Sequence, residues 1–331
     1  MPRAVRGVAA RRYRGRTRQV LRDRRETHVL VEVQIAPARE PRSAMSSPPT
    51  VRLALAARAE NVAIVREVLA GVVAATTLTD SLDDLKTAVS EAANNVVLHA
   101  YAGAEGPLEV EFRLYPDELE VVVGDRGQGL ESAADIEAGA TAQSEGRGPG
   151  HGLGLAVMEA LADRVELRTR EPVGFEVVLG FRLIAHEAEP RARNDGPTGF
   201  AWPAHPDGEV KLQLVPASLG VDLIDRVICT LAARAGFSID RLSDAQLLAD
   251  ALAAQLEPVS AGDGVVFAAR GEAGRLELVF GPLVSGGARE ALASSTIGEI
   301  GPVIERLVDE VDTRELDDGH ELLELVMLAQ R

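Results

Sequence analysis

The spacing of hydrophobic residues after residue 50 predicts short strands and helices of ordinary length. Hydrophobic side chains alternate over residues 51–55, which is the two-residue period of a half-buried strand. Between residues 62 and 72 they recur every three or four positions, the spacing of one helix face. Ser81 followed by Asp84 is typical of a helix start, and the apolar stripe behind it predicts a helix to about His99.

Two hairpins and one more helix complete this region. Hydrophobic residues alternate over 108–114, and after a Pro-Asp turn the valine-rich residues 119–124 return as a second strand. A glycine-rich stretch then leads to Gly154 and a helix through Asp163, and residues 165–183 form a closing hairpin. Helices between hairpins predict an α+β fold, a two-layer sandwich with helices on one face of a mixed, mainly antiparallel sheet.

The same pattern returns later in the chain. Residues 186–208 hold four prolines and three glycines without a periodic apolar pattern, so we interpret them as a linker. After it, residues 210–231 repeat the strand and helix of residues 51–72. Residues 303–311 match 157–165 at five of nine positions. This order of matches predicts an internal duplication, with two unrelated α+β domains as the alternative.

Charge is distributed unevenly along the chain. The net charge is −16, but residues 1–44 carry 12 Arg and 4 Asp or Glu, a balance of +8, which leaves −24 for residues 45–331. So acidic a body disfavours nucleic-acid binding and suits basic protein partners. The basic start fits a nucleic-acid arm, a membrane-surface segment, or a disordered or untranslated stretch ahead of Met45.

Composition also indicates the cellular compartment of the protein. The single cysteine, Cys229, excludes a disulfide framework and a cysteine-based zinc site. No apolar run approaches the length needed to cross a bilayer. We therefore expect a cytoplasmic protein with no direct contact to a membrane.

One candidate site lies on the predicted helix that ends near His99. Glu91 and Asn95 are four residues apart and therefore share a helix face. A carboxylate and an amide oxygen one turn apart suit a hard divalent cation with a water or hydroxyl beside it. A satisfied polar patch at a helix edge fits this pair equally well.

Two glycine-rich segments follow. Asp125, Gly127 and Gly129 come directly off a valine-rich strand, which fits either a ligand-facing carboxylate or a plain Asp-Gly turn. Residues 146–155 are rich in glycine and lead into a helix, where backbone N–H groups and the helix N-terminus favour a phosphate. This loop matches neither a Walker A loop nor a Rossmann fingerprint.

The order and spacing of these three clusters resemble the GHKL ATPase superfamily. Within it, the Ser-Glu-Ala-x-x-Asn motif at residues 90–95 and the His-Ala-Tyr at 99–101 are similar to the bacterial anti-sigma-factor serine/threonine kinases. The resemblance covers residues 51–185 by motif and residues 210–331 only by fold. It implies a Bergerat-type sandwich, duplicated, with a degenerate second copy.

The resemblance implies a role for each matching residue. Asn95 would hold the Mg²⁺ that bridges the ATP phosphates, and Glu91 would be the general base for an attacking hydroxyl. Asp125 would accept a hydrogen bond from the adenine amino group. Gly127 and Gly129 would let the base lie close.

The glycine-rich loop would close over the phosphates. Residues 131–150 would form its flexible lid, and Gly150, Gly152 and Gly154 would lie against the phosphates. Family members often carry an arginine just before the second glycine pair, where this chain reads Pro-Gly-His. We expect Arg147 to substitute for it.

The second copy lacks these side chains. Asp250 and Ala254 align with Glu91 and Asn95, or Ala251 and Gln255 do if the register slips by one. Pro282 and Val284 replace Asp125 and Gly127, so we expect no nucleotide there. The hypothesis is that this copy completes a pseudo-dimer within one chain or forms a partner-docking surface.

The boundaries and the function follow from this interpretation. We expect a basic extension (1–50), an ATP-binding kinase domain (51–185), a linker (186–208) and a degenerate GHKL-like domain (209–331). The chain would bind a sigma factor and phosphorylate a STAS-type anti-anti-sigma protein, using ATP and Mg²⁺.

Other functions keep part of the same site. A nucleotide-gated binding module would still need Asn95 and Asp125 but not Glu91. A sensor histidine kinase fragment is disfavoured because no phospho-acceptor helix precedes the ATPase region. Topoisomerase and mismatch-repair relatives carry a transducer domain that the second copy does not resemble.

Overall fold

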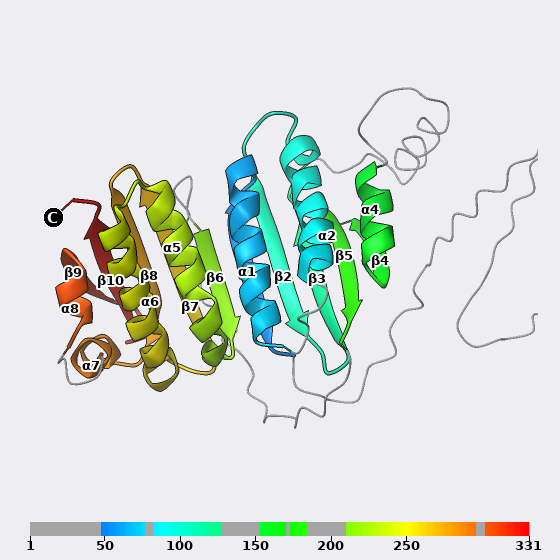
Figure 1. The fold of residues 1–331 in the computed structure, drawn as a ribbon. Helices are drawn as coiled ribbons and strands as arrows, with labels where there is room; N and C mark the ends of the chain where they lie inside the picture. The colour runs from blue at the N-terminus through cyan, green and yellow to red at the C-terminus, as the bar shows by residue number, and fades with distance from the viewer. Residues whose placement is uncertain are drawn as a thin grey trace, which may run out of the picture. The chain divides into compact units, whose positions relative to one another are not determined.

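The computed structural model describes residues 48–76, 82–127, 153–169, 173–183, 210–295 and 302–330. In these ranges ten strands form a single sheet in the order β4-β5-β3-β2-β1-β6-β7-β8-β10-β9 (Figure 1). The predicted Ser81 helix start, the lid and the linker lie outside the described residues, as do residues 1–47 of the basic extension. Its last residue, Thr50, belongs to the first strand.

The first half contributes the strands on one side of the sheet and the helices that cover them. Its elements are β1 (Thr50–Ala56), η1 (Ala59–Asn61), α1 (Val62–Ala74), α2 (Leu82–Asn95), the π-helical turn η2 (Val96–Ala100), β2 (Pro107–Leu114), β3 (Glu118–Gly124), α4 (Leu153–Leu161), β4 (Arg164–Thr169) and β5 (Phe175–Arg182).

The second half contributes the remaining strands. Its elements are β6 (Val210–Val215), η3 (Ala217–Asp222), α5 (Ile224–Arg234), α6 (Ile239–Val259), β7 (Val265–Glu272), β8 (Arg275–Leu283), α7 (Gly287–Ser294), α8 (Ile304–Leu307), β9 (Glu310–Glu315) and β10 (Glu321–Leu328).

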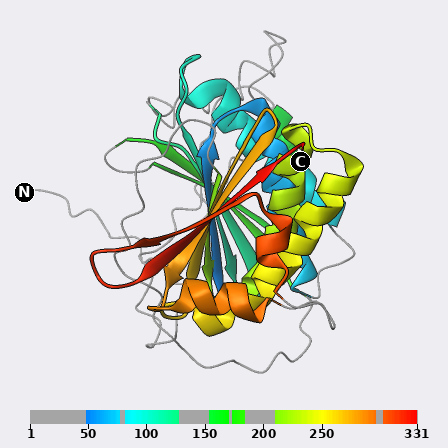
Figure 2. The same cartoon turned by 90° about the vertical axis from the view of Figure 1, so that its left-hand side faces the viewer.

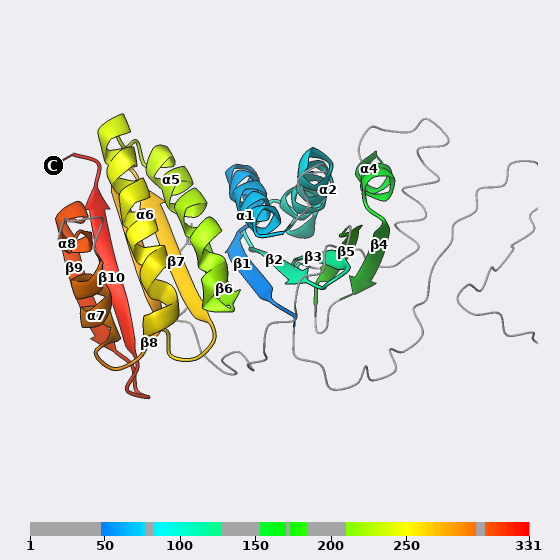
Figure 3. The same cartoon turned by 60° about the horizontal axis from the view of Figure 1, so that its bottom comes forward.

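The described helices all lie on one face of the sheet, as the α+β prediction expects (Figures 2 and 3). Alternation along the strands directs one set of side chains toward them: Val121 and Val123 of β3 are buried in the core under the helices, while Glu120, which precedes Val121, points to the other face. The expectation of a mixed sheet is wrong for the described strands, because every neighbouring pair is antiparallel.

The two halves join through β1 and β6, which pair in antiparallel register with Leu53 opposite Leu212. Outward from this pair, both halves have the same strand order. The spacing of 159 residues that aligns Val51 with Val210 also aligns Leu53 with Leu212. Residues that are equivalent by sequence therefore face each other at the centre of the sheet, as they would on a local twofold axis.

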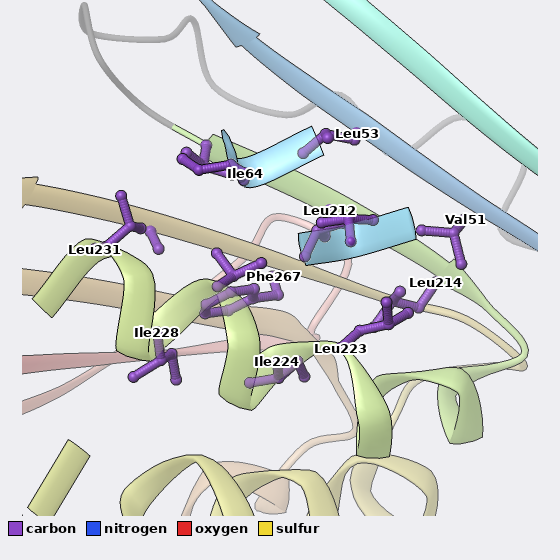
Figure 4. Close-up of a cluster of buried hydrophobic side chains, with 14 of the residues drawn as sticks. Val51, Leu53, Ile64, Leu212, Leu214, Leu223, Ile224, Ile228, Leu231 and Phe267 are labelled. Carbon is purple, nitrogen blue, oxygen red and sulfur yellow. The ribbon is translucent and has the colours of Figure 1, made fainter. Parts of the chain in front are cut away.

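Hydrophobic side chains from both halves fill the space beneath this joint. Leu53, Ile64, Leu212, Ile224 and Phe267 are at most 1% exposed and belong to one continuous core (Figure 4). Burial of apolar surface contributes about 25 cal/mol per Å², so this shared core stabilises the joint between the halves.

Candidate functional site

Helices α2 and α4 bring three of the predicted site residues together. Glu91 and Asn95 lie in the last turns of α2 and are half-buried. Gly154 is in the first turn of α4, and a Cβ placed on it would lie 3.3 Å from Glu91 Oε2 and 3.5 Å from Asn95 Oδ1. The N-terminus of α4 therefore lies next to both polar groups.

This arrangement is suited to an anion and a hard cation. The first N–H groups of a helix have no partner within the helix, and the helix dipole adds a partial positive charge there. Glu91 and Asn95 place oxygen atoms at the same location, and Mg²⁺ typically takes one or two protein oxygens while phosphate and water complete its shell. The donor set fits Mg²⁺ that is held jointly with a phosphate.

A second group of predicted residues lies at the end of β3. Asp125 is 5% exposed, its backbone N–H donates to Phe175 O at 3.0 Å, and its Oδ1 accepts from the Gly127 N–H at 2.8 Å. These bonds fix the carboxylate in place directly after a buried strand. The Asp-Gly turn of the alternative interpretation is present, because the bond from the Gly127 N–H to Oδ1 forms it.

Gly127 connects this group to the helix that carries Glu91. A Cβ on Gly127 would lie 1.9 Å from Ala100 O, at the end of the π-helical turn that follows Asn95. Only glycine permits this contact, so the strand end and the helix end have a fixed relation. A π-helical turn is rare and often marks a functional site.

Tyr101 and Gly174 also stabilise the contact between the end of β3 and the end of the π-helical turn. No role for either residue was predicted from the sequence. The Tyr101 hydroxyl donates to Pro107 O at 2.5 Å and accepts from the Arg126 N–H at 2.8 Å. Burial raises the pKa of this hydroxyl, so it stays neutral at physiological pH. Gly174 has φ +129°, and a Cβ there would lie 2.2 Å from Asp125 O. Two features of the sequence could have indicated these roles. Tyr101 ends the His-Ala-Tyr motif, and Gly174 lies in the turn of the last hairpin.

The remaining predicted site residues lie outside the described residues. They are the second glycine of the Asp-Gly motif and the members of the glycine-rich loop: Gly129, Arg147, Gly150 and Gly152. Their roles stay predictions.

The second half has no comparable group of side chains at the aligned positions. Asp250 and Ala254 are exposed on α6, and Gln255 of the alternative register donates to Ser294 O at 3.4 Å. Pro282 lies within β8 and offers no side-chain acceptor. In either register, the pair equivalent to Glu91 and Asn95 is missing.

A helix N-terminus in the second half is already satisfied by the protein itself. The Glu321 carboxylate accepts from the Gly286 N–H at 2.7 Å and from the Ala288 N–H at 3.1 Å, at the start of α7. An incoming phosphate would have to displace this carboxylate.

Two further findings concern metals and membranes. Within the described ranges, no group of three or more His, Cys, Asp or Glu side chains could hold a metal ion by itself. No helix among the described elements is both long and apolar enough to span a bilayer.

Known proteins resemble the first half. A family of histidine kinase-like ATPase domains matches residues 55–181. The serine-protein kinase RsbW of Halalkalibacterium halodurans is 35% identical over 156 residues, which span 45% of this chain and 91% of that protein. RsbW of Bacillus pumilus is 35% identical over 37% of this chain and 80% of its own length. RsbW of Listeria innocua is 34% identical over 44% and 94%.

These findings place the first half in a class and then in a family. It is a histidine kinase-like ATPase domain, as the predicted GHKL resemblance required. More narrowly, the chain belongs to the RsbW serine-protein kinase family, which confirms the expected anti-sigma-factor kinase subgroup. The ATPase-domain match ends at residue 181, so it leaves the origin of the second half as a prediction.

Proposed function

We propose that residues 51–185 bind ATP with Mg²⁺ and transfer its γ-phosphoryl group to a serine or threonine hydroxyl of another protein. The observation that carries this proposal is the contact of Gly154 with Glu91 and Asn95, which places a helix N-terminus beside a base and an oxygen ligand. Family membership supports the reaction class.

Each residue has a defined task in this reaction. Asn95 would hold the Mg²⁺, which offsets the negative charge on the phosphates when it is bound. The N-terminus of α4 would orient the phosphates, and Asp125 would accept a hydrogen bond from the adenine amino group. Such chemistry depends mostly on positioning and charge neutralisation.

Glu91 would complete the transfer as the general base. Its carboxylate takes the proton of the acceptor hydroxyl as that oxygen bonds to the γ-phosphorus. The bond from the γ-phosphorus to the bridging oxygen breaks, and ADP leaves with the electron pair. The products are ADP and a phosphoester on the acceptor protein.

Further elements of the proposal concern partners and stoichiometry. Acceptor and regulatory partners would be a STAS-type antagonist and a sigma factor, in a cytoplasmic setting. The second half would bind no nucleotide, so one ATP would bind per chain. Binding of two ATP molecules per chain would contradict the degenerate-copy hypothesis.

The first test is calorimetric titration of ATP with and without Mg²⁺. We expect one site per chain, with Mg²⁺-dependent affinity that falls at least about 100-fold in Asn95→Ala, since the metal and its phosphate contacts are lost together. Asn94→Ala, one position away on the same helix, is the matched control and should bind normally. No ATP binding by the wild type at millimolar concentration would refute the nucleotide proposal.

Glu91→Gln separates the kinase from a nucleotide-gated binding module. The variant should bind Mg²⁺-ATP within about threefold of wild type but lose at least about 100-fold in transfer rate, because the base is gone. Unchanged transfer would remove Glu91 from the mechanism. Full regulation of a partner by a variant that cannot transfer phosphate would favour the binding-module alternative.

A further inference from the structure

The surface that joins the halves includes a charged residue pair on the local twofold axis. The 159-residue spacing that aligns Leu53 with Leu212 also aligns Glu67 of α1 with Arg226 of α5. These two side chains form an ion pair, with 3.4 Å between Arg226 Nη1 and Glu67 Oε2. The same position in the two halves thus carries opposite charges that meet.

This pairing discriminates between unlike and like halves. In a twofold interface between identical copies, a residue on the axis faces its own equivalent. Two first halves joined in this way would oppose two glutamates, and two second halves would oppose two arginines. Like charges at this distance repel, so only the unlike combination gains an attraction.

The close approach of α1 to the second half also depends on a residue that differs between the halves. A Cβ on Gly71 would lie 2.4 Å from Asp222 O and 2.6 Å from Leu223 Cδ2. The equivalent residue of the second half is Thr230. A second half in the place of the first would therefore introduce a branched side chain where backbone fills the space.

A polar contact between the halves repeats this asymmetry. Arg234 donates to Asn61 Oδ1 at 3.1 Å and also to the Glu60 carbonyl. The equivalent positions across the axis are Ala75 and Gly220, which have no polar side chain. A pair of two first halves would lose this contact on both sides.

We propose that the β1–α1 face of the first half is a docking surface for an unlike copy, supplied here by residues 210–331, and that it rejects a second copy of itself. Glu67 and Arg226 set the charge selectivity, whereas Gly71 permits a close approach that Thr230 would block in a pair of two second halves. The inference does not depend on nucleotide binding or phosphotransfer.

Crosslinking in the full chain tests which segment occupies the β1–α1 face. In a Cys229→Ser background, Glu67→Cys with Arg226→Cys should give an intrachain crosslink with a short bis-maleimide, in a protein that sediments as a monomer. Asp83→Cys with Arg226→Cys is the matched control, with one site moved to α2. Glu67→Cys alone should give no crosslinked dimer. Efficient crosslinking of two Glu67→Cys chains to each other through this position would overturn the proposal.

Charge reversal tests whether the Glu67–Arg226 pair selects the partner. Glu67→Arg and Arg226→Glu should each lower the unfolding midpoint by about 1–3 °C, and the double reversal should recover most of that loss. The difference in unfolding midpoint between the single and double variants should shrink in 1 M salt, where charges are screened within about 3 Å. Additive losses in the double variant would overturn the charge assignment.

Gly71→Thr tests the steric part with the residue of the other half. Because backbone of η3 occupies the space, we expect the unfolding midpoint to fall by about 5 °C. Ala74→Thr, which places the same residue at an exposed position of the same helix, is the control. Equal effects of the two substitutions would remove Gly71 from the selectivity.

Discussion

The two halves use the same strand order but treat a helix N-terminus in opposite ways. In the first half the start of α4 lies against Glu91 and Asn95, with no side chain on Gly154 to fill the space. In the second half the start of α7 is closed by the protein's own carboxylate at Glu321. The helix that aligns with α4 is α8, since residues 303–311 match 157–165, so α7 has no counterpart among the described helices of the first half. The same strand order thus carries a different set of helices in each half.

The largest expected effect concerns Gly127 and its aligned residue in the second half, Val284. Gly127→Ala should cost about 1–3 kcal/mol in the free energy of unfolding and weaken ATP binding, because the new methyl group would collide with Ala100 O. Val284 is 38% exposed, so Val284→Ala should cost less than about 1 kcal/mol. Urea unfolding of both variants checks this contrast, and equal costs would contradict the assigned role of Gly127.

A smaller effect is expected at Glu120 on the face without helices. Its side chain accepts from Arg113 and Arg164, each at 2.8 Å, and is 2% exposed. The aligned residue, Glu277, is 38% exposed and pairs with Arg275. Glu120→Gln should therefore cost about 1–2 kcal/mol at neutral pH, because the amide oxygen can still accept one of the two hydrogen bonds. Glu277→Gln should cost less than about 1 kcal/mol. Urea unfolding of the two variants measures both costs.

The stabilising effect of Glu120 should depend on pH with a definite sign. Burial by itself would raise the pKa of Glu120, but hydrogen bonds from Arg164 and Arg113 outweigh it and lower the pKa below the ordinary 4.5. The stabilisation is therefore complete above pH 4.5 and is lost as the pH falls through the lowered value. The stability gap between wild type and Glu120→Gln should shrink in acid. A gap that grows in acid would contradict the ion network.

The smallest effect concerns the closed helix of the second half. Glu321→Ala should destabilise the protein by about 1 kcal/mol, since two N–H groups at the start of α7 lose their acceptor. Nucleotide stoichiometry should stay at one per chain because Asp250 and Ala254 supply no oxygen ligand pair. A second ATP bound by Glu321→Ala would show that this carboxylate alone closes the site.

Local patterns were enough to predict most elements but not their pairing. Alternation at residues 51–55 and 108–114 predicted strands because each strand has one face in the core. The pairing of β1 with β6 depends on two strands 159 residues apart, and no local pattern encodes such a contact. The short α8 and the early end of α4 at Leu161 also differ from the expectation, since helix ends depend on the chain that follows.

The candidate site was predictable where chemistry needs a particular side chain. The spacing of Glu91 and Asn95 placed them on one helix face, and Asp125 follows directly from its strand. Tyr101 and Glu321 were missed because their roles rest on backbone groups that are distant in sequence. Such partners become visible only when the fold is known.

The negative charge of Glu67 at the joint between the halves also matters during protein synthesis. The outer edge of β1 finds its partner only when β6 has been made, which at about 5–20 residues per second takes roughly 10–30 s. During this interval an unpaired strand edge can join the same strand of a neighbouring nascent chain on one messenger RNA. Repulsion between the two Glu67 carboxylates opposes that association, so the residue that selects the partner in the finished protein also protects the half-made one.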